Sequence, residues 1–333
     1  MRLGLAYDLK EMICAGPGGD DDLEEYDSWE TVARLVKYLE AGGHQVVMLG
    51  GGAEFLSKIL TEKVDFVFNI AEGRGNYRSR EAQVPAVLEM LGIPYSGSDP
   101  QCLAVCLDKP LTKQLVAAAG GRTPKGLLLG SRQDITLIAG SGLTFPAIIK
   151  PAYEGSSKGI KLSSVVAGPE EAASAAEELL RHCRQPVMIE EFIRGTEVTV
   201  GVIGNDPPAV LGMMAVVPKK SEPDFVYSLE VKRNYLELVD YQCPARLEPE
   251  VLCDLEASAL SACKTLGCRD FARLDYRISP GGVPYFLEAN PLPGLGSYSD
   301  LVIMAEMTGL GHSGLVARVL GAALGRYPQC VVA

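Results

Sequence analysis

The sequence predicts an α/β protein that begins with a parallel β-sheet covered by helices on both faces. Short apolar segments alternate with helical segments from Leu3 to about Gly97, which is the pattern of strand–helix–strand units in a parallel sheet. From Val187 onward the chain is instead rich in strands before its last helices. At 333 residues the chain is long enough for two or three domains with cores of their own.

The first segment is expected to contain four strands and three helices. Ser28 is a typical N-cap for the first helix, and Gly42-Gly43 are typical of its end. The apolar runs predict strands at 3–7, 45–49, 64–69 and 93–95, and helices at 28–41, 53–60 and 80–91.

The rest of the chain divides into two further segments. Two helices are expected first, at 100–109 and ending at Gly120-Gly121, and Thr123-Pro124 begin the next strand. A buried-type strand at 145–151, a Gly/Ser loop, and a strand and helix to about 184 follow. Strands from 187 then precede helices at 248–266 and after 301. The predicted domains are 1–98, 99–186 and 187–333.

Composition excludes several classes of protein. The net charge of -11 and a pI near 4.9 argue against nucleic acid or an anionic membrane as the main partner. We see no signal peptide and no apolar run long enough for a bilayer, so we expect a cytoplasmic protein. The sequence has only three histidines, and none lies near a Gly-x-Ser-x-Gly elbow, which argues against a serine or cysteine hydrolase. Nine scattered cysteines are expected to be reduced core thiols, since Cys102/Cys106 and Cys263/Cys268 do not match zinc spacing.

A hairpin near the end of the chain carries a candidate metal site. Two aromatic-rich strands flank a Pro-Gly-Gly turn, and a two-residue loop at Gly281-Gly282 would place Asp275 opposite Glu288 and Arg273 opposite Asn290. Two facing carboxylates repel unless a positive charge lies between them. Carboxylates with an amide suit a hard cation such as Mg²⁺ held together with substrate phosphates. The alternative is a solvated polar face on an edge hairpin.

The second candidate is a Gly/Ser loop after a buried-type strand. Lys150 ends that strand, and a buried ammonium needs an anion. Residues 153–159 follow with two glycines, two serines and a lysine, whose donors could cover phosphates. This loop is neither Gly-x-Gly-x-x-Gly nor a P-loop. The alternative is a Gly-rich hairpin with an exposed lysine.

The third candidate is the connector between two strands at 187–193 and after Gly195. Its backbone groups could hydrogen-bond the edge of an adenine, and Glu197 could accept ribose hydroxyls. The alternative is an ordinary salt-bridged hinge.

The order of these elements closely resembles the ATP-grasp superfamily, and four motifs resemble the D-alanine–D-alanine ligase family. These motifs are Leu91–Ser98, Leu107–Lys113, Lys150–Gly159 and Glu288–Gly294, so the resemblance covers nearly the whole chain. It implies an ATP-grasp fold: an N-terminal parallel α/β (pre-ATP-grasp) domain followed by two α+β subdomains that sandwich ATP.

The resemblance implies an ATP-dependent ligase that joins a carboxylate to an amine. ATP would phosphorylate the carboxylate, and the amine of a second amino-acid-like substrate would attack the acyl phosphate, with release of ADP and phosphate. The family's ATP contacts fall on Lys109, Lys150, Gly155, Glu190, Glu191, Phe192, Ile193 and Glu197. Its two Mg²⁺ ions fall on Asp275, Glu288 and Asn290. The group that contacts the transferred phosphoryl group falls on Lys232. The groups that stabilise the oxyanion fall on Arg273 and the N–H of Gly294. The loop serine that meets the substrate falls on Ser156 or Ser157.

The substrate positions differ more from the family. Ser299 matches the serine that contacts the second amino acid, and either Glu24 or Glu25 matches the glutamate for the first ammonium. Three charges replace the family's residues: Glu72, Arg233 and Asp300. They predict amino acids other than D-alanine, because a pocket for D-alanine would seldom accept unpaired buried charges. The alternative is that these charges face solvent or pair with one another, for instance Arg233 with Asp300.

Two rival functions share the same elements. A related kinase would stop at phosphorylation and need no amine acceptor, and a scaffold would bind the nucleotide without turnover. Degenerate scaffolds usually lose a metal carboxylate or the arginine, and this sequence keeps both. The resemblance also implies a homodimer.

Overall fold

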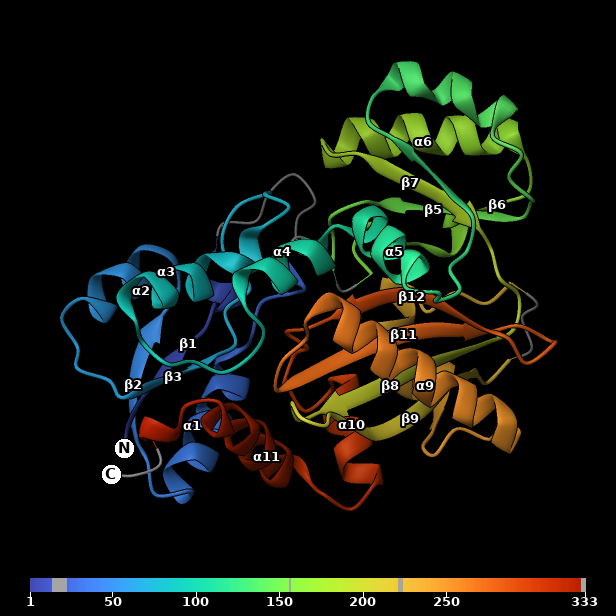
Figure 1. The fold of residues 1–333 in the computed structure, drawn as a ribbon. Coiled ribbons are helices and arrows are strands. Elements are labelled where there is room, and N and C mark those ends of the chain that lie inside the picture. The colour runs from blue at the N-terminus through green and yellow to red at the C-terminus, as the bar shows by residue number, and fades with distance from the viewer. Residues whose placement is uncertain (14–22, 156, 221–223, 331–333) are drawn as a thin grey trace.

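The computed structural model describes residues 1–13, 23–155, 157–220 and 224–330. It contains three β-sheets (Figure 1). The first sheet is parallel, as predicted, and its strands follow the order β2-β1-β3. Its strands are β1 (Arg2–Ala6), β2 (Gln45–Gly50) and β3 (Phe66–Asn69). The strand predicted at 93–95 is a single bridge between Tyr95 and Val67.

Helices cover both faces of this sheet. One face packs on α2 (Gly52–Ile59) and α3 (Gln83–Leu91). The other packs on α1 (Trp29–Ala41), which Ser28 caps as predicted by accepting the N–H of Thr31. The last helix, α11 (His312–Gly325), lies beside α1 on that same face, so the end of the chain returns to the first sheet (Figure 1).

Two short helices lead to the second sheet. They are α4 (Pro100–Leu107) and α5 (Lys109–Ala118), and the side chains of Asp99 and Asp108 cap them. The second sheet is antiparallel, and α6 (Pro169–Cys183) packs against it. Its strands, in spatial order, are β4 (Gly126–Leu129), β7 (Val187–Glu191), β5 (Ala147–Pro151) and β6 (Val165–Val166). β7 thus lies between β4 and β5. The division of the chain into three domains at 98 and 186 stays a prediction.

The third sheet is also antiparallel. α9 (Pro249–Leu266) covers one face, and α10 (Asp300–Met307) joins it to the core of the first sheet. Its strands, in spatial order, are β10 (Val239–Gln242), β9 (Ala209–Pro218), β8 (Thr196–Ile203), β11 (Phe271–Ile278) and β12 (Pro284–Asn290). Two short helices, α7 (Leu229–Arg233) and α8 (Tyr235–Leu238), precede β10. The 3₁₀ helices are Lys10–Met12, Arg80–Ala82, Arg132–Gly140, Leu162–Ser164 and Pro328–Cys330.

The hairpin of β11 and β12 has the predicted register, although the predicted loop is wrong. Asp275 pairs with Glu288, and Arg273 pairs with Asn290. The loop between Ser279 and Val283 has three residues rather than two, which shifts the pairing by one residue. A β-bulge after Asp275 shifts it back, so the two departures cancel at the polar end of the hairpin.

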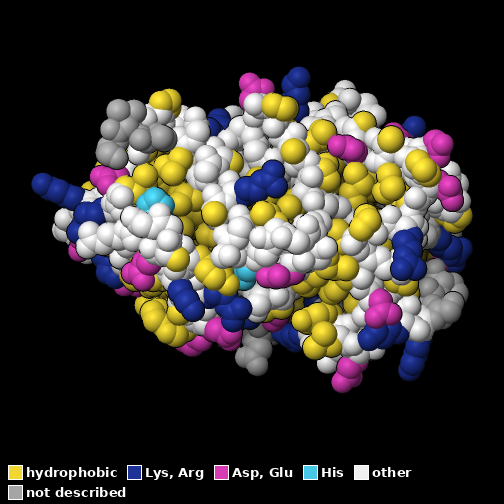
Figure 2. Space-filling model, turned by 90° about the horizontal axis from the view of Figure 1, so that it is seen from below, with side chains coloured by type: hydrophobic (Ala, Val, Ile, Leu, Met, Phe, Trp, Pro, Cys, Tyr) yellow, Lys and Arg dark blue, Asp and Glu magenta, His cyan; other side chains and the backbone are white. Residues whose placement is uncertain are grey.

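The surface gives no single-sign patch on the face seen from below. In Figure 2, basic and acidic side chains are interspersed with apolar ones across this face. Among the described residues, we find no helix that combines the length and the apolar character needed to cross a bilayer.

Candidate functional site

A cavity between the second and third sheets collects most of the residues predicted to hold ATP. β5 and β7 supply one wall, and β8, β11 and β12 supply the other. The predicted residues that line it are Lys150, Ser157, Glu190, Glu191, Phe192, Ile193, Glu197, Lys232, Asp275, Glu288 and Asp300. The side chains come from segments more than 100 residues apart, so the fold assembles this site from both sheets.

A buried ion triad lies at one side of the cavity. Glu190 is 1% exposed, and its two carboxylate oxygens lie 2.6 Å from the Lys150 ammonium and 2.8 Å from the Lys113 ammonium. Burial alone would raise the pKa of Glu190, but the two lysine charges outweigh it and lower the pKa. For Lys113 burial dominates, and its pKa falls to about 8.

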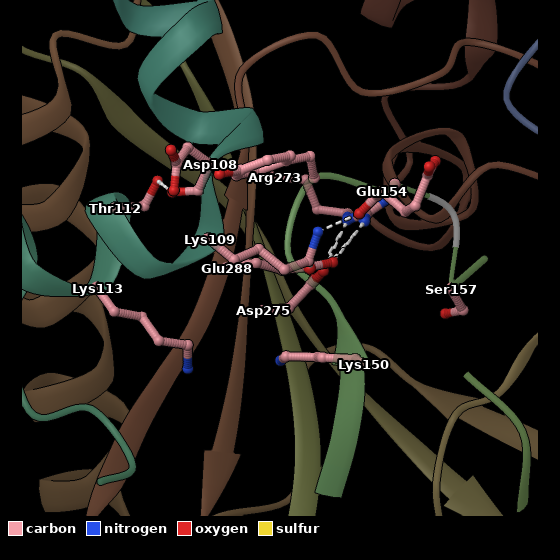
Figure 3. Close-up of polar contacts among 12 residues, drawn as sticks. Asp108, Lys109, Thr112, Lys113, Lys150, Glu154, Ser157, Arg273, Asp275 and Glu288 are labelled. Atoms are coloured by element: carbon pink, nitrogen blue, oxygen red, sulfur yellow. Dashed lines mark hydrogen bonds and ion pairs between the residues drawn. The ribbon is translucent and has the colours of Figure 1, made fainter. Parts of the chain in front are cut away.

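Lys113 is a residue that the sequence reasoning missed. Prediction from the motif chose Lys109, whereas the structure places Lys113 beside Lys150 (Figure 3). The two candidates are four residues apart on α5 and therefore share a face. That spacing was the available signal, since it places both ammonium groups toward the same side of the helix.

Lys109 instead lies at the predicted metal cluster. Its ammonium is 3.3 Å from Glu288, and it also donates to the carbonyl of Glu154. The Arg273 guanidinium lies 3.0 Å from Asp275 and 3.9 Å from Glu288. Figure 3 shows these four side chains converging at one point. Arg273 therefore lies near both facing carboxylates, and Lys109 adds a second positive charge beside Glu288.

The two carboxylates differ in their electrostatics. Burial would raise the pKa of Glu288, but Lys109, Lys150 and Arg273 lower it well below its usual range. Burial raises the pKa of Asp275; the nearby Arg273 opposes this shift, while the Glu288 charge adds to it. Asp275 also accepts a hydrogen bond of 3.0 Å from the Thr199 hydroxyl. Positive charge near the pair therefore favours the ionised form of both carboxylates, while their burial and mutual repulsion oppose it.

The donor set fits Mg²⁺. Two opposed carboxylates and the Asn290 amide two residues from Glu288 on β12 provide oxygen ligands, which hard divalent cations prefer. The Asn290 amide oxygen accepts the N–H of Leu292 at 3.0 Å and keeps a second lone pair. Lys109 and Arg273 supply the positive charge near the carboxylates in the described structure.

Arg277 organises the predicted adenine connector, and sequence reasoning missed it as well. It is 4% exposed and donates to the carbonyls of Gly195 and Phe225 at 3.1 and 2.9 Å. Its guanidinium lies 4.5 Å from the ring centre of Phe192 and 3.4 Å from the Glu197 carboxylate. One buried cation thus fixes the backbone and two side chains of the connector.

Lys232 and Ser157 both lie around Tyr227. The Lys232 ammonium is 5.1 Å from the centre of the tyrosine ring, and the Ser157 hydroxyl donates to the Tyr227 carbonyl at 3.1 Å. Tyr227 therefore ties the Gly/Ser loop to the segment that carries Lys232. Ser156, the other candidate serine, lies outside the described residues.

The suggested pairing of Arg233 with Asp300 is wrong. Asp300 lies 3.5 Å from Arg273 and accepts a 3.4 Å hydrogen bond from the Tyr227 hydroxyl. Arg233 lies 2.9 Å from Glu24, one of the two candidate glutamates for the first substrate. Each of these charges therefore has an opposite charge beside it within the protein.

Ser299 and Gly294 lie next to each other at the start of α10. Ser299 is the N-cap residue of this helix. A Cβ at Gly294 would lie 3.0 Å from the Ser299 hydroxyl, so a larger residue would crowd the serine. The predicted oxyanion N–H and the predicted contact for the second amino acid are thus neighbours in space.

Glu25 is already saturated with donors. Its carboxylate accepts two hydrogen bonds from Arg80 at 2.7 and 2.8 Å and one from the N–H of Gly155 at 2.7 Å. The Lys158 ammonium lies 3.0 Å away. These cations outweigh burial and lower the pKa of Glu25 to about 2. Glu25 thus fastens the Gly/Ser loop to the first segment.

Glu72 and Glu81 lie close to this network. Burial, together with the charges of Glu81 and Glu25, raises the pKa of Glu72 well above its usual value. Burial raises the pKa of Glu81 to about 7, although Arg80 opposes the shift. The first segment therefore presents an acidic region beside the Gly/Ser loop.

Comparison with known proteins relates the whole chain to one family. The family model described as the D-ala D-ala ligase C-terminus matches residues 129–321. A D-alanine–D-alanine ligase from Aquifex aeolicus is 34% identical over 91% of this chain and 97% of its own length. An uncharacterised protein, y4sG, from Sinorhizobium fredii is 32% identical over 88% of this chain and 87% of its own length.

Solved structures show the same fold. A D-alanine–D-alanine ligase from Bacillus anthracis complexed with ATP superposes with a TM-score of 0.76 at 23% identity and covers 99% of both chains. The VanG D-Ala:D-Ser ligase from Enterococcus faecalis gives a TM-score of 0.73 at 23% identity and covers 97% of this chain and 99% of its own. At these identities the superpositions show the fold alone. The family is shown by the sequence matches. The chain belongs to the D-alanine–D-alanine ligase family and has its ATP-grasp fold.

Proposed function

We propose that this protein is an ATP-dependent ligase that joins two amino acids through an acyl phosphate and releases ADP and phosphate. The observation that carries the proposal is the convergence of Lys109, Arg273, Asp275 and Glu288 beside the buried Lys113–Glu190–Lys150 triad. A cluster of cations and carboxylates in one cavity suits a reaction in which charge moves between phosphate oxygens.

The nucleotide is proposed to lie in the cavity between the two antiparallel sheets. The connector at 190–193 would frame the adenine, and Glu197 would bind the ribose. Lys150 would hold phosphates, since it lines the cavity, and Lys113 would assist it, since it pairs with the same Glu190 carboxylate. ATP contacts by Lys109 and Gly155, predicted from the motifs, stay part of the proposal.

Asp275, Glu288 and Asn290 would hold Mg²⁺, which supplies charge neutralisation for the β- and γ-phosphates. Arg273 would face the oxyanion that develops on the attacked carboxylate, together with the N–H of Gly294. Lys232 would contact the transferred phosphoryl group. These groups act by position and charge, so the main task of the fold is to hold them in place.

The substrate proposal rests on the acidic region of the first segment. Arg233 and Asp300 each have an oppositely charged neighbour, so neither by itself calls for a charged substrate. Glu25 is occupied by Arg80, Lys158 and a backbone N–H, and Glu24 pairs with Arg233, which leaves Glu72 as our candidate for the ammonium of the first amino acid. Ser299 is proposed to contact the carboxylate of the second.

Site variants test the proposal. Asp275→Ala and Glu288→Ala are expected to abolish ADP release with any pair of amino acids. Both variants should still unfold in one cooperative thermal transition, which shows that they are folded. Full turnover in either variant would contradict the proposed metal site. The homodimer and the cytoplasmic location implied by the family stay predictions, and sedimentation of the purified protein checks the first.

A further inference from the structure

Three cysteine thiols from two distant segments of the chain meet where α4 packs against the connection between α9 and β11. Cys102 and Cys106 are one turn apart on α4, and Cys268 follows the last turn of α9. The Sγ of Cys102 lies 3.9 Å from the Sγ of Cys106 and 3.9 Å from the Sγ of Cys268. All three sulfur atoms lie within 4.8 Å of one another.

These thiols are not a disulfide. A disulfide bond is about 2.05 Å long, and the 3.9 Å separations are nearly twice that. Cys102, Cys106 and Cys268 are free thiols. Cys102 and Cys106 are almost fully buried, whereas Cys268 is half-buried and gives the cluster a route to solvent.

The spacing matches the geometry of a three-coordinate metal ion. Metal–sulfur bonds of about 2.3 Å place three sulfur atoms at the corners of a triangle with sides of about 4 Å. Two of the observed separations already have this length, and the third needs only a small adjustment of side chains.

The donors select a soft ion. Within the described part of the chain, no histidine or carboxylate joins the three sulfur atoms at ligand distance. Structural zinc sites use four ligands, while thiolate donors suit monovalent copper. Three sulfur donors without a fourth ligand therefore favour Cu⁺ over Zn²⁺.

The first turn of α4 favours a thiolate at this site, whereas burial opposes it and raises the pKa of Cys102 and Cys106. Cys102 is the third residue of α4, so its sulfur lies in the first turn, where the helix dipole favours negative charge. Hydrogen bonding to Cys102, together with burial, raises the pKa of the Cys106 thiol well above its ordinary value. Binding must therefore displace thiol protons to the solvent, and the copper stays monovalent throughout.

We propose that Cys102, Cys106 and Cys268 form a binding site for monovalent copper. The site lies next to the junction between the first segment and the third sheet. There Ser98 accepts the N–H of Arg269 at 2.9 Å, and Gly97 donates to Asp270 at 2.7 Å. An ion on these sulfurs would tie α4 to the same junction and stabilise the folded chain by mass action.

The test is an anaerobic titration of the full-length reduced protein with Cu⁺ in competition with a chromogenic copper(I) chelator. We expect one equivalent of Cu⁺ per chain, a thiolate-to-copper absorption band in the near ultraviolet, and a rise in Tm. Mutation of a residue that only hydrogen-bonds to a metal ligand lowers metal affinity by roughly 10- to 100-fold. Cys102→Ser and Cys268→Ser remove a ligand itself, so the affinity for Cu⁺ should fall by at least that factor.

Cys253→Ser is the matched control, because Cys253 is exposed on α9 and away from the cluster. It should bind Cu⁺ like the parent. Cys268→Ser changes a half-buried residue, and its circular dichroism and apo Tm show whether it folds. Binding that is unchanged in Cys268→Ser, or no binding against the chelator, would overturn the proposal. Tighter binding of Zn²⁺ than of Cu⁺ would overturn the choice of ion.

Discussion

The carboxylate of Glu190 holds two buried lysines, so Glu190→Gln should destabilise the protein strongly. The change keeps the shape of the side chain and removes its charge. It leaves Lys113 and Lys150, 7% and 5% exposed, with two ammonium groups that have lost the carboxylate between them. Breaking a buried ion pair from one side costs about 3–5 kcal/mol. At about 2–4 °C per kcal/mol for a chain of this size, Tm should fall by roughly 10 °C at pH 7.

The loss should shrink as pH rises. The pKa of Lys113 is about 8 in the folded protein, below its ordinary value, because burial outweighs the attraction of Glu190. A lysine with a lowered folded pKa binds fewer protons in the folded state, so its contribution to stability rises with pH above that pKa. Without Glu190 the pKa of Lys113 falls further, the pKa of Lys150 loses the Glu190 charge that helps to raise it, and this rise in stability begins at lower pH. The variant should therefore lie closer to the parent at pH 9 than at pH 7.

Thermal unfolding followed by circular dichroism at pH 7 and pH 9 measures both effects. Glu191→Gln is the control, because the neighbouring Glu191 is half-buried and its carboxylate accepts a 3.1 Å hydrogen bond from the exposed N–H of Thr144. Its cost should stay below about 1 kcal/mol. If the two variants unfold at the same temperature, the buried triad does not carry the stability that its geometry implies.

Four further results are expected. Lys113→Met should weaken ATP binding by about 10-fold or more in calorimetry, because a charged donor worth about 1.5–3 kcal/mol is lost. Asp275→Asn should remove Mg²⁺-dependent turnover and leave Tm nearly unchanged, and a large drop in Tm would point to a structural role instead. Because the pKa of Glu81 is raised to about 7 in the folded protein, the parent should lose up to about 3 kcal/mol of stability as pH rises from 4.5 to 7. Glu81→Gln should not show this loss, and equal pH profiles of the two proteins would contradict the prediction. Arg233→Ala should cost at most about 1 kcal/mol, because its pair with Glu24 is partly exposed, and a larger loss would show that the pair is structural.

The sequence predicted the first parallel sheet and the register at the polar end of the hairpin. Alternation of strands and helices predicted the first parallel sheet, because each strand–helix–strand unit is local in sequence. The pairing of Asp275 with Glu288 was predicted correctly for an incomplete reason. Turn residues do not show where a bulge will fall, and the bulge compensated for a loop that was one residue longer.

Contacts between distant segments were the part that the sequence could not supply. Periodicity shows which face of α5 carries Lys113, but not that this face meets Glu190 of β7. The same holds for Glu25, which looked available for a substrate ammonium until the structure placed Arg80 and Lys158 on it. Such pairings depend on how separately predicted elements pack, and that packing is decided by the whole fold.

The most direct measurement is ADP and phosphate release from ATP and Mg²⁺ with D- and L-amino acids, singly and in pairs, with mass spectrometry of the products. We predict release that depends on a particular pair and yields a product with the mass of both amino acids minus water. A D-alanine pair alone would show that Glu72 does not change the preferred substrate. Release that needs no amine acceptor, and yields only a phosphorylated product, would contradict the proposed ligase.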